Sequence, residues 1–423
     1  MGDVLELAER AWNGDLGGAN VHPGRVLVAL EVLDEGAAFQ SAFSNALILR
    51  TDEGLVFVDT SSFFHAEPIY RAVRAWTDAP VHTGIYTHGH VDHVFGLQRF
   101  HDEAEAQGRP AVRILAHERC PARFDRYRLT QGYNGHINAR QFGFARPIFP
   151  RAFRYPDETV GAERRLEIGG VAIELHHDRG ETDDSLWAWL PARRALYTGD
   201  LFIWAAPNCG NPQKAQRYPR EWAAALRKMA RLAPESLFPG HGPPILGAAR
   251  VAQALSESAE LLETICEQTL AMMNDGATLN DILHSVSVPQ GLLERPYLRP
   301  IYDDPIFIVR TLWRLYGGWY DGNPAHLKPS PDRDLARELA ALAGGAGRLA
   351  DRAESACADG DLALACELAE FAWLAAPDDA RVRGVRAAVY RARANAETSL
   401  MAKGIYGAAA RDCEPDADGA AER

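Results

Sequence analysis

The chain has 423 residues, and its 45 Lys and Arg residues stand against 57 Asp and Glu residues, which gives a formal net charge of −12. A surface of that sign repels phosphate backbones and anionic lipids, so the composition argues against nucleic acid and against a membrane as partners. A chain of this length exceeds the size at which a single hydrophobic core usually stops growing, so we expect two domains.

The amino-terminal segment and the cysteines both bear on location. Residues 1–6 carry acids where a secretory signal carries Lys or Arg, and no apolar stretch approaches the length of a membrane span. The six cysteines are scattered and form no Cys-x-x-Cys pair, which is typical of reduced thiols. Together these features predict a cytoplasmic protein.

A cluster of metal-binding residue types follows the β-branched and aromatic run at residues 81–87. Three imidazoles and one carboxylate occupy the next six positions, and an amphipathic helix is expected at residues 94–106. Mixed nitrogen and oxygen donors without a nearby thiol favour zinc or another first-row ion over calcium. Because four donors already lie in one loop and distant segments would add more, the pattern predicts two divalent ions, expected to be zinc. The four residues are His88, His90, Asp92 and His93.

The motif His-x-His-x-Asp-His after a strand resembles the signature of the metallo-β-lactamase superfamily. The resemblance implies an α+β protein with an αββα sandwich, and further site residues at the ends of other strands. Asp59, which closes the strand at residues 55–58, matches an aspartate that would orient an imidazole from outside the metal's own ligands. Asp200 matches the bridging carboxylate of the family, and His241 matches its last histidine.

One departure from the common superfamily pattern points to a particular branch. Most members place a histidine ahead of the strand that precedes the bridging acid, and Glu181 occupies that place when counted back from Pro191. A glutamate here is similar to the alkylsulfatase branch, the type III sulfatases. Asp183 and Asp184 are the alternatives if the alignment of this loop is shifted. The implied ligands are His88, His90 and Glu181 for one ion, Asp92, His93 and His241 for the other, and Asp200 for both.

The second half of the chain resembles the alkylsulfatase dimerisation domain. The resemblance rests on residues 318–325, Gly-Trp-Tyr-Asp-Gly-Asn-Pro-Ala, and on residues 267–282, and the segment from residue 248 is nearly all helical by periodicity. It implies a catalytic domain at residues 1–246 and an all-α helical domain at 247–411 that forms a homodimer. The composition of residues 412–423, rich in Pro, Gly, Ala and acids, predicts a flexible tail. No sterol-carrier-like domain follows, which favours a small-molecule substrate over one with a long hydrocarbon tail.

The resemblance also implies residues that bind the substrate. Residues 133–140 resemble a family loop that borders the substrate pocket, and residues 207–217 keep part of the family's register after the bridging acid. A proline and a glutamine stand there in place of the expected histidine and arginine, although other cations can carry an anion contact. The substrate-binding candidates are Tyr133, Asn138, Arg140, Asn208, Lys214 and Arg217.

These features predict a binuclear metal hydrolase that attacks with a metal-bound hydroxide. Asp92 is assigned a secondary catalytic role as acceptor of the proton from the water. The predicted substrate is a small organic sulfate ester. The alternative is a hydrolase of the same fold that acts on a lactone, thioester, β-lactam or carboxylic ester. A metal-binding protein with a vestigial site is a third interpretation, and the intact ligand set argues against it.

Overall fold

The computed structural model describes residues 2–16, 18 and 21–413, so the tail expected at 412–423 lies almost wholly outside the described residues. The chain forms two compact units, one of Met1–Gln131 with Pro150–Gly318 and the other of Gly132–Phe149 with Trp319–Arg423. This division groups residues 247–318 with the first unit. The domain boundary at residue 246 stays a prediction.

The first β-sheet of the first unit holds the loops of the predicted metal cluster. In the described residues its strand order is β1-β2-β3-β4-β5-β6-β7, antiparallel up to β4 and parallel from β4 onward. The strands are β1 (Ala29–Asp34), β2 (Ala37–Ser41), β3 (Ala46–Thr51), β4 (Gly54–Val58), β5 (Val81–Ile85), β6 (Arg113–His117) and β7 (Glu158–Val160).

The second sheet has the order β13-β12-β11-β10-β9-β8 within the described residues. Its pairs are antiparallel except for β11 and β12, which run parallel. The strands are β8 (Glu163–Ile168), β9 (Val171–His177), β10 (Leu186–Leu190), β11 (Ala195–Tyr197), β12 (Ser236–Phe238) and β13 (Ile245–Leu246).

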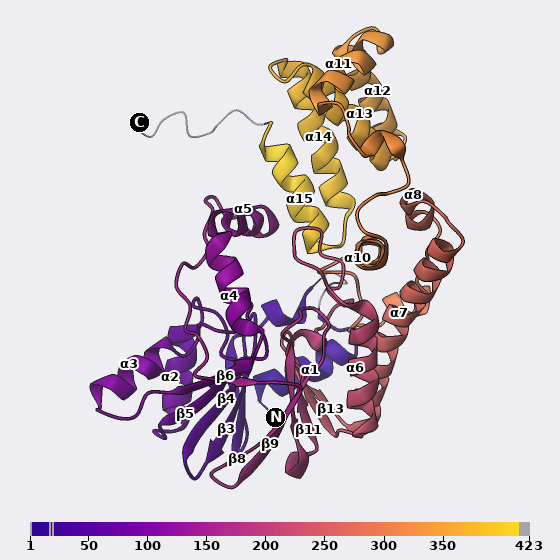
Figure 1. Cartoon of the computed structure of the whole chain (residues 1–423). Helices are drawn as coiled ribbons and strands as arrows, with labels where there is room; N and C mark the ends of the chain where they lie inside the picture. Colours follow the sequence, from indigo (N-terminus) through magenta and orange to yellow (C-terminus); the bar gives the residue numbers. More distant parts are fainter. Residues whose placement is uncertain (1, 17, 19–20, 414–423) are drawn as a thin grey trace. The chain divides into compact units, whose positions relative to one another are not determined.

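The two sheets pack face to face, and helices cover their outer faces, as Figure 1 shows. Side chains alternate along a strand, so Val56 and Val58 of β4 face the second sheet while Leu55 and Phe57 face the helices. Because both faces are buried, the strand is apolar throughout. The predicted αββα sandwich is confirmed.

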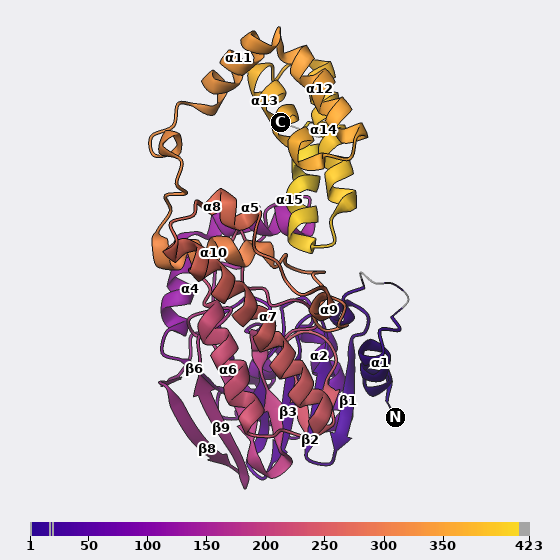
Figure 2. The same cartoon turned by 90° about the vertical axis from the view of Figure 1, so that its right-hand side faces the viewer.

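The helices of the first unit divide between the two outer faces. Helices α2, α3 and α4 contribute to the core on the first sheet, and α6 and α7 lie side by side on the second (Figure 2). The helices are α1 (Asp3–Trp12), α2 (Ala66–Trp76), α3 (Gln98–Ala106), α4 (Cys120–Leu129), α6 (Pro219–Arg231), α7 (Ala248–Asn274), α8 (Leu279–Leu283), α9 (Gln290–Leu293) and α10 (Ile306–Gly317).

Helix α3 begins four residues later than the sequence pattern indicates. The backbone of the preceding turn bonds to another loop instead of continuing a helix, because Thr60 donates its amide to the His93 carbonyl and Phe95 donates to the Ser61 carbonyl. A Cβ at Gly96 would lie 1.5 Å from the Thr60 carbonyl oxygen, so only glycine fits this crossing. The turn therefore fixes the end of the histidine loop against the loop after β4.

The second unit is helical and has its own core of small apolar side chains. Alanines such as Ala350, Ala353 and Ala369 are buried there beside Val385, which lets neighbouring helices approach closely. Helix α5 (Gln131–Phe142) enters this unit from the first, and α15 crosses it so closely that a Cβ at Gly404 would lie 2.7 Å from a carbonyl oxygen of α5. The remaining helices are α11 (Asp332–Ala343), α12 (Ala346–Ala358), α13 (Leu362–Ala375), α14 (Ala380–Ala396) and α15 (Leu400–Arg411).

Helices long and apolar enough to cross a membrane are not found among the described residues.

Candidate metal centre

The predicted ligands come from loops that follow the strands at one edge of each sheet. Strands β4 and β5 are parallel neighbours, and so are β11 and β12, so the loops after each pair begin at the same sheet edge. Packing of the two sheets then brings these loops together with the loop between β9 and β10. The residues that converge are Asp59, His88, His90, Asp92, His93, Glu181, Asp200 and His241.

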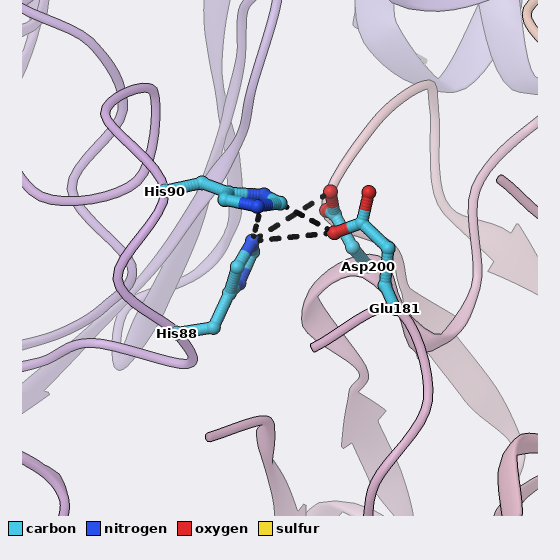
Figure 3. A group of neighbouring side chains, drawn as sticks. All are labelled: His88, His90, Glu181 and Asp200. Atoms are coloured by element: carbon cyan, nitrogen blue, oxygen red, sulfur yellow. Dashed lines mark hydrogen bonds and ion pairs between the residues drawn. The ribbon is translucent and has the colours of Figure 1, made fainter. Parts of the chain in front are cut away.

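The first ligand group joins two histidines of the β5 loop to two acids of the second sheet (Figure 3). His88 Nε2 lies 3.5 Å from Glu181 Oε2 and 3.8 Å from Asp200 Oδ2. His90 Nδ1 lies 3.2 Å from the same Glu181 oxygen and 2.9 Å from His88 Nε2. One atom of each of the four side chains lies within 4.8 Å of the others, which is close enough for a single ion.

The second ligand group consists of Asp92, His93 and His241, whose ligand atoms also lie within 4.8 Å of one another. Asp92 Oδ2 lies 3.7 Å from His93 Nε2 and 3.5 Å from His241 Nε2. Asp200 connects the two groups, since its carboxylate oxygens lie 3.3 Å from both His93 Nε2 and His241 Nε2. The geometry therefore offers two neighbouring sites with one carboxylate between them.

The histidines of the second group are held in a fixed orientation by hydrogen bonds on their far side. His93 Nδ1 pairs with Asp59 Oδ2 at 2.8 Å, and His241 Nδ1 pairs with the Phe43 carbonyl oxygen. Donation from Nδ1 leaves Nε2 of each ring with its lone pair toward the ligand group. Asp59 also accepts from the Thr87 amide and hydroxyl at 2.7 and 2.8 Å, so its carboxylate links the loops after β4 and β5.

Glu181 is oriented in the same way by two neighbours. Arg217 forms an ion pair with its Oε1, and Asn208 Nδ2 donates to that oxygen at 2.7 Å. Arg217 in turn donates to the Asn208 carbonyl. With Oε1 engaged, Oε2 is the oxygen that faces His88 and His90.

The donor atoms fit divalent ions. Among the described residues, His93 Nε2, Glu181 Oε2 and Asp200 Oδ1 are buried and have no hydrogen-bond partner, which is costly unless a cation lies between them. The carboxylates of Asp59, Asp92, Glu181 and Asp200 bring four negative charges, and the Arg217 guanidinium offsets one of them. Two divalent ions would more than offset the remaining three.

Comparison with known protein families assigns both halves of the chain. The metallo-beta-lactamase superfamily profile matches residues 42–241, and the alkyl sulfatase dimerisation profile matches residues 278–415. The chain joins a metallo-β-lactamase domain to an alkylsulfatase dimerisation domain. The resemblance inferred from the sequence is thereby confirmed for both domains.

Characterised relatives match across both domains. The chain is 28% identical over 399 residues to a linear primary-alkylsulfatase of Pseudomonas sp., a match that covers 88% of this chain and 74% of the relative. It is 26% identical to an (R)-specific secondary-alkylsulfatase of Pseudomonas sp., covering 81% of this chain and 56% of the relative. It is also 26% identical to the alkyl/aryl-sulfatase BDS1 of Saccharomyces cerevisiae, covering 73% and 52%.

Solved structures support the fold. The sec-alkylsulfatase Pisa1 from Pseudomonas sp. superimposes with a TM-score of 0.81 at 22% identity, over 93% of this chain and 67% of that chain. A double mutant of the same protein gives a TM-score of 0.82 over 95% of this chain and 70% of that chain. At this level of identity the likeness establishes the fold.

The side chains of the two ligand groups shift one another's pKa values. Burial lowers the pKa of His93, but Asp200 and the other nearby carboxylates outweigh it and raise that pKa well above its ordinary value. The same balance raises the pKa of His241. Burial raises the pKa of Asp200, yet His241 and His93 outweigh it and hold that pKa well below its usual range.

These directions predict that metal binding near neutral pH releases protons. In the metal-free protein the raised pKa values keep His93 and His241 protonated to higher pH than usual, and a metal must displace those protons. Affinity for zinc should therefore fall as the pH is lowered through the raised values. Calorimetric titration with zinc in two buffers of different ionisation enthalpy measures the protons released. Equal apparent enthalpies in the two buffers would contradict the prediction.

The predicted substrate residues fall into two groups. Asn208 and Arg217 are buried and lie against Glu181, while Lys214 is half-buried close to the same site. Burial and the nearby Arg217 lower the pKa of Lys214 to about 8, against the opposing effect of Asp92 and Glu181. The others, Tyr133, Asn138 and Arg140, lie on α5 in the second unit, and their contact with substrate stays a prediction.

The residues that hold the loops of the metallo-β-lactamase domain together were not predicted from the sequence. Asn45 Nδ2 donates to the Pro239 and Gly242 carbonyls at 2.9 and 2.7 Å, which holds the turn that carries His241. Arg123 of α4 pairs with Asp184, and Asp184 accepts from the Gly89 amide in the histidine loop. A polar residue among apolar strands, such as Asn45, could have indicated the contact with the His241 turn. The Arg123 contact left no local signal.

Proposed function

We propose that this protein is a binuclear metal-dependent hydrolase of small organic sulfate esters. The observation that carries the proposal is the pair of imidazole and carboxylate groups joined by Asp200, buried in a domain combination that the alkylsulfatase relatives share. The relatives named as alkylsulfatases match through both domains, whereas type 2 metallo-β-lactamases match 47% of this chain.

The residues have separate duties in this proposal. One ion would be held by His88, His90 and Glu181, the other by Asp92, His93 and His241, with Asp200 between them. The nitrogen and oxygen donors favour zinc. Divalent ions at such a site supply a water of lowered pKa as nucleophile and screen the negative charge of the substrate.

The surrounding side chains position the ligands and the substrate. Asp59 orients the imidazole of His93, and Arg217 with Asn208 orients the carboxylate of Glu181. Lys214 is the proposed contact for an anionic group of the substrate. Its ammonium lies close to the ligand carboxylates and forms no ion pair within the described residues. Asp92 is retained as a secondary acceptor for the proton of the attacking water.

Hydrolysis measured with and without bound metal tests the function. The zinc-loaded protein is expected to release sulfate from short alkyl or aryl sulfates, to lose that activity on chelation, and to regain it when zinc is restored. A lactone, a thioester, a β-lactam and a carboxylic ester are tested as substrates beside the sulfates. Turnover of one of these without any sulfate release would select the alternative function, which the proline and glutamine in the segment after Asp200 favour.

We also propose that the chain forms a homodimer through its dimerisation domain. Trp319 and Leu327 lie in the part of the chain that the dimerisation profile matches, and they are 68% and 53% exposed. Light scattering of the full chain should give twice the monomer mass. Trp319→Ser combined with Leu327→Ser is expected to weaken the dimer, whereas Leu342→Ser, which changes a leucine of α11 that is 84% exposed, serves as the control.

Location in the cytoplasm also stays part of the proposal. It rests on the six cysteines, none of which is paired in a disulfide in the structure. Thiol titration of the unfolded protein isolated without reductant should find all six free.

A further inference from the structure

His22 lies beside the metal centre and has no part in the roles assigned above. It precedes the short 3-10 helix η1 (Pro23–Arg25), whose backbone lies against the turn that carries His241. A Cβ at Gly24 would lie 3.0 Å from the Gly242 amide nitrogen, so the two turns are in close contact. The segment around His22 thus borders the second ligand group.

The hydrogen bonding of the His22 ring fixes its tautomer. The Gly24 amide donates to His22 Nδ1 at 3.1 Å, so Nδ1 must carry a lone pair and the proton of the neutral ring is on Nε2. Burial, with His241 and Arg25, lowers the pKa of His22 to about 3, and Asp200 opposes this less strongly. The ring is therefore neutral, and its Nε2–H is a fixed hydrogen-bond donor.

Tyr302 holds the ring from a second direction. The centroids of the His22 and Tyr302 rings lie 6.1 Å apart in an edge-on arrangement. Tyr302 packs on a small apolar cluster that includes Ile203, and Ile203 pairs with His241 through a β-bridge. The imidazole thus lies between its own turn and Tyr302, which packs on the segment that pairs with His241.

The position of His22 does not match that of a further metal ligand. Within the described residues, the ligand groups are complete without it, and neither group includes one of its ring nitrogens. A purely structural role would be met by Nδ1, which caps the turn, and none of the hydrogen bonds among the described residues engages Nε2. His22 therefore offers a hydrogen-bond donor in a segment that contacts the turn carrying His241.

We propose that His22 Nε2–H donates a hydrogen bond to the oxygen on which negative charge develops when the ester bond of the substrate breaks. The proposal rests on the hydrolytic function assigned above and holds for sulfate and acyl esters alike. A neutral imidazole used in this way stabilises the charge and keeps its own proton, so the proton that the leaving oxygen finally takes is the one released by the attacking water and accepted by Asp92.

Substitution of His22 in the zinc-loaded full chain tests the proposal. His22→Ala is expected to lower kcat about 10²-fold with two ions still bound, and His22→Gln, which keeps an N–H donor, to lose less. The loss should be larger for an alkyl sulfate than for 4-nitrophenyl sulfate, because more charge builds up on an alkoxide oxygen. It should also be constant from about pH 6 to 9, since a neutral donor does not titrate there.

The outcomes separate this proposal from the assigned function. His284→Ala, at an exposed histidine after α8, is the matched control and should leave kcat unchanged. An unchanged kcat in His22→Ala, a loss of bound zinc, or an equal loss for both leaving groups would overturn the role of His22 and leave the hydrolase standing. A wild-type protein that binds zinc and hydrolyses none of the esters would overturn the hydrolase and this proposal together.

Discussion

Asp200→Asn is expected to abolish binding of the second metal ion and to lower hydrolysis about 10³-fold, the effect of several kcal/mol of lost charge stabilisation. Asp200 is the side chain that lies within 3.8 Å of histidines from both ligand groups. Asparagine keeps the size of the side chain but brings no negative charge between the two sites. Metal analysis by mass spectrometry and the rate of sulfate release measure the two effects.

The matched control for this substitution is Asp78→Asn, which removes an exposed carboxylate in the loop between α2 and β5. It should leave both metal content and rate unchanged. Full metal content and an undiminished rate in Asp200→Asn would place Asp200 outside the centre. A variant that keeps both ions but loses the rate would show that Asp200 acts on the reaction and is dispensable for assembling the site.

The strand ends were the most predictable part of the site. Asp59 and Asp200 each follow an apolar strand whose periodicity is readable without a structure, and a strand end fixes where the next side chains go. The structure brings both to the histidine loop. Glu181 was placed by counting back along a strand of fixed spacing, and the structure puts it, rather than Asp183 or Asp184, beside His88 and His90.

The contacts that orient the ligands could not be predicted in the same way. Arg217 was assigned to the substrate because a cation near a metal centre suits an anion, whereas the structure places it on the far oxygen of Glu181. His22 lies more than 200 residues from His241 in sequence, and nothing in the local pattern around it marks a site. Such pairings depend on how loops from different strands cross, which is decided by tertiary packing.

Arg123→Ala is expected to destabilise the first unit by about 3–5 kcal/mol, the usual effect of leaving a buried charge without its partner. Arg123 is buried on α4, where its Nε donates to Asp184 Oδ1 at 2.8 Å and its Nη2 pairs with Asp183. The other oxygen of Asp184 accepts from the Gly89 amide at 3.0 Å. The measurement is the unfolding of the metal-free protein in urea, followed by the fluorescence of its tryptophans.

The control is Arg71→Ala, because the ion pair between Arg71 and Glu67 is exposed and should contribute at most about 1 kcal/mol. A second variant, Arg123→Met with Asp184→Leu, removes both charges and should recover part of the lost stability. If Arg123→Ala lowers the free energy of unfolding no more than Arg71→Ala does, the buried network contributes nothing measurable to stability.

The pH dependence of the Arg123→Ala effect separates its electrostatic part from lost packing. Burial raises the pKa of Asp184, but Arg123 and the hydrogen bonds to the carboxylate outweigh it, so the folded-state pKa is lowered. A group with a lowered pKa contributes stability above its unfolded pKa and loses that contribution as the pH falls through the folded value. The difference in the free energy of unfolding between wild type and Arg123→Ala should therefore shrink in acid.

Because Gly89 lies between His88 and His90, the same variant should also bind zinc about 10- to 100-fold more weakly.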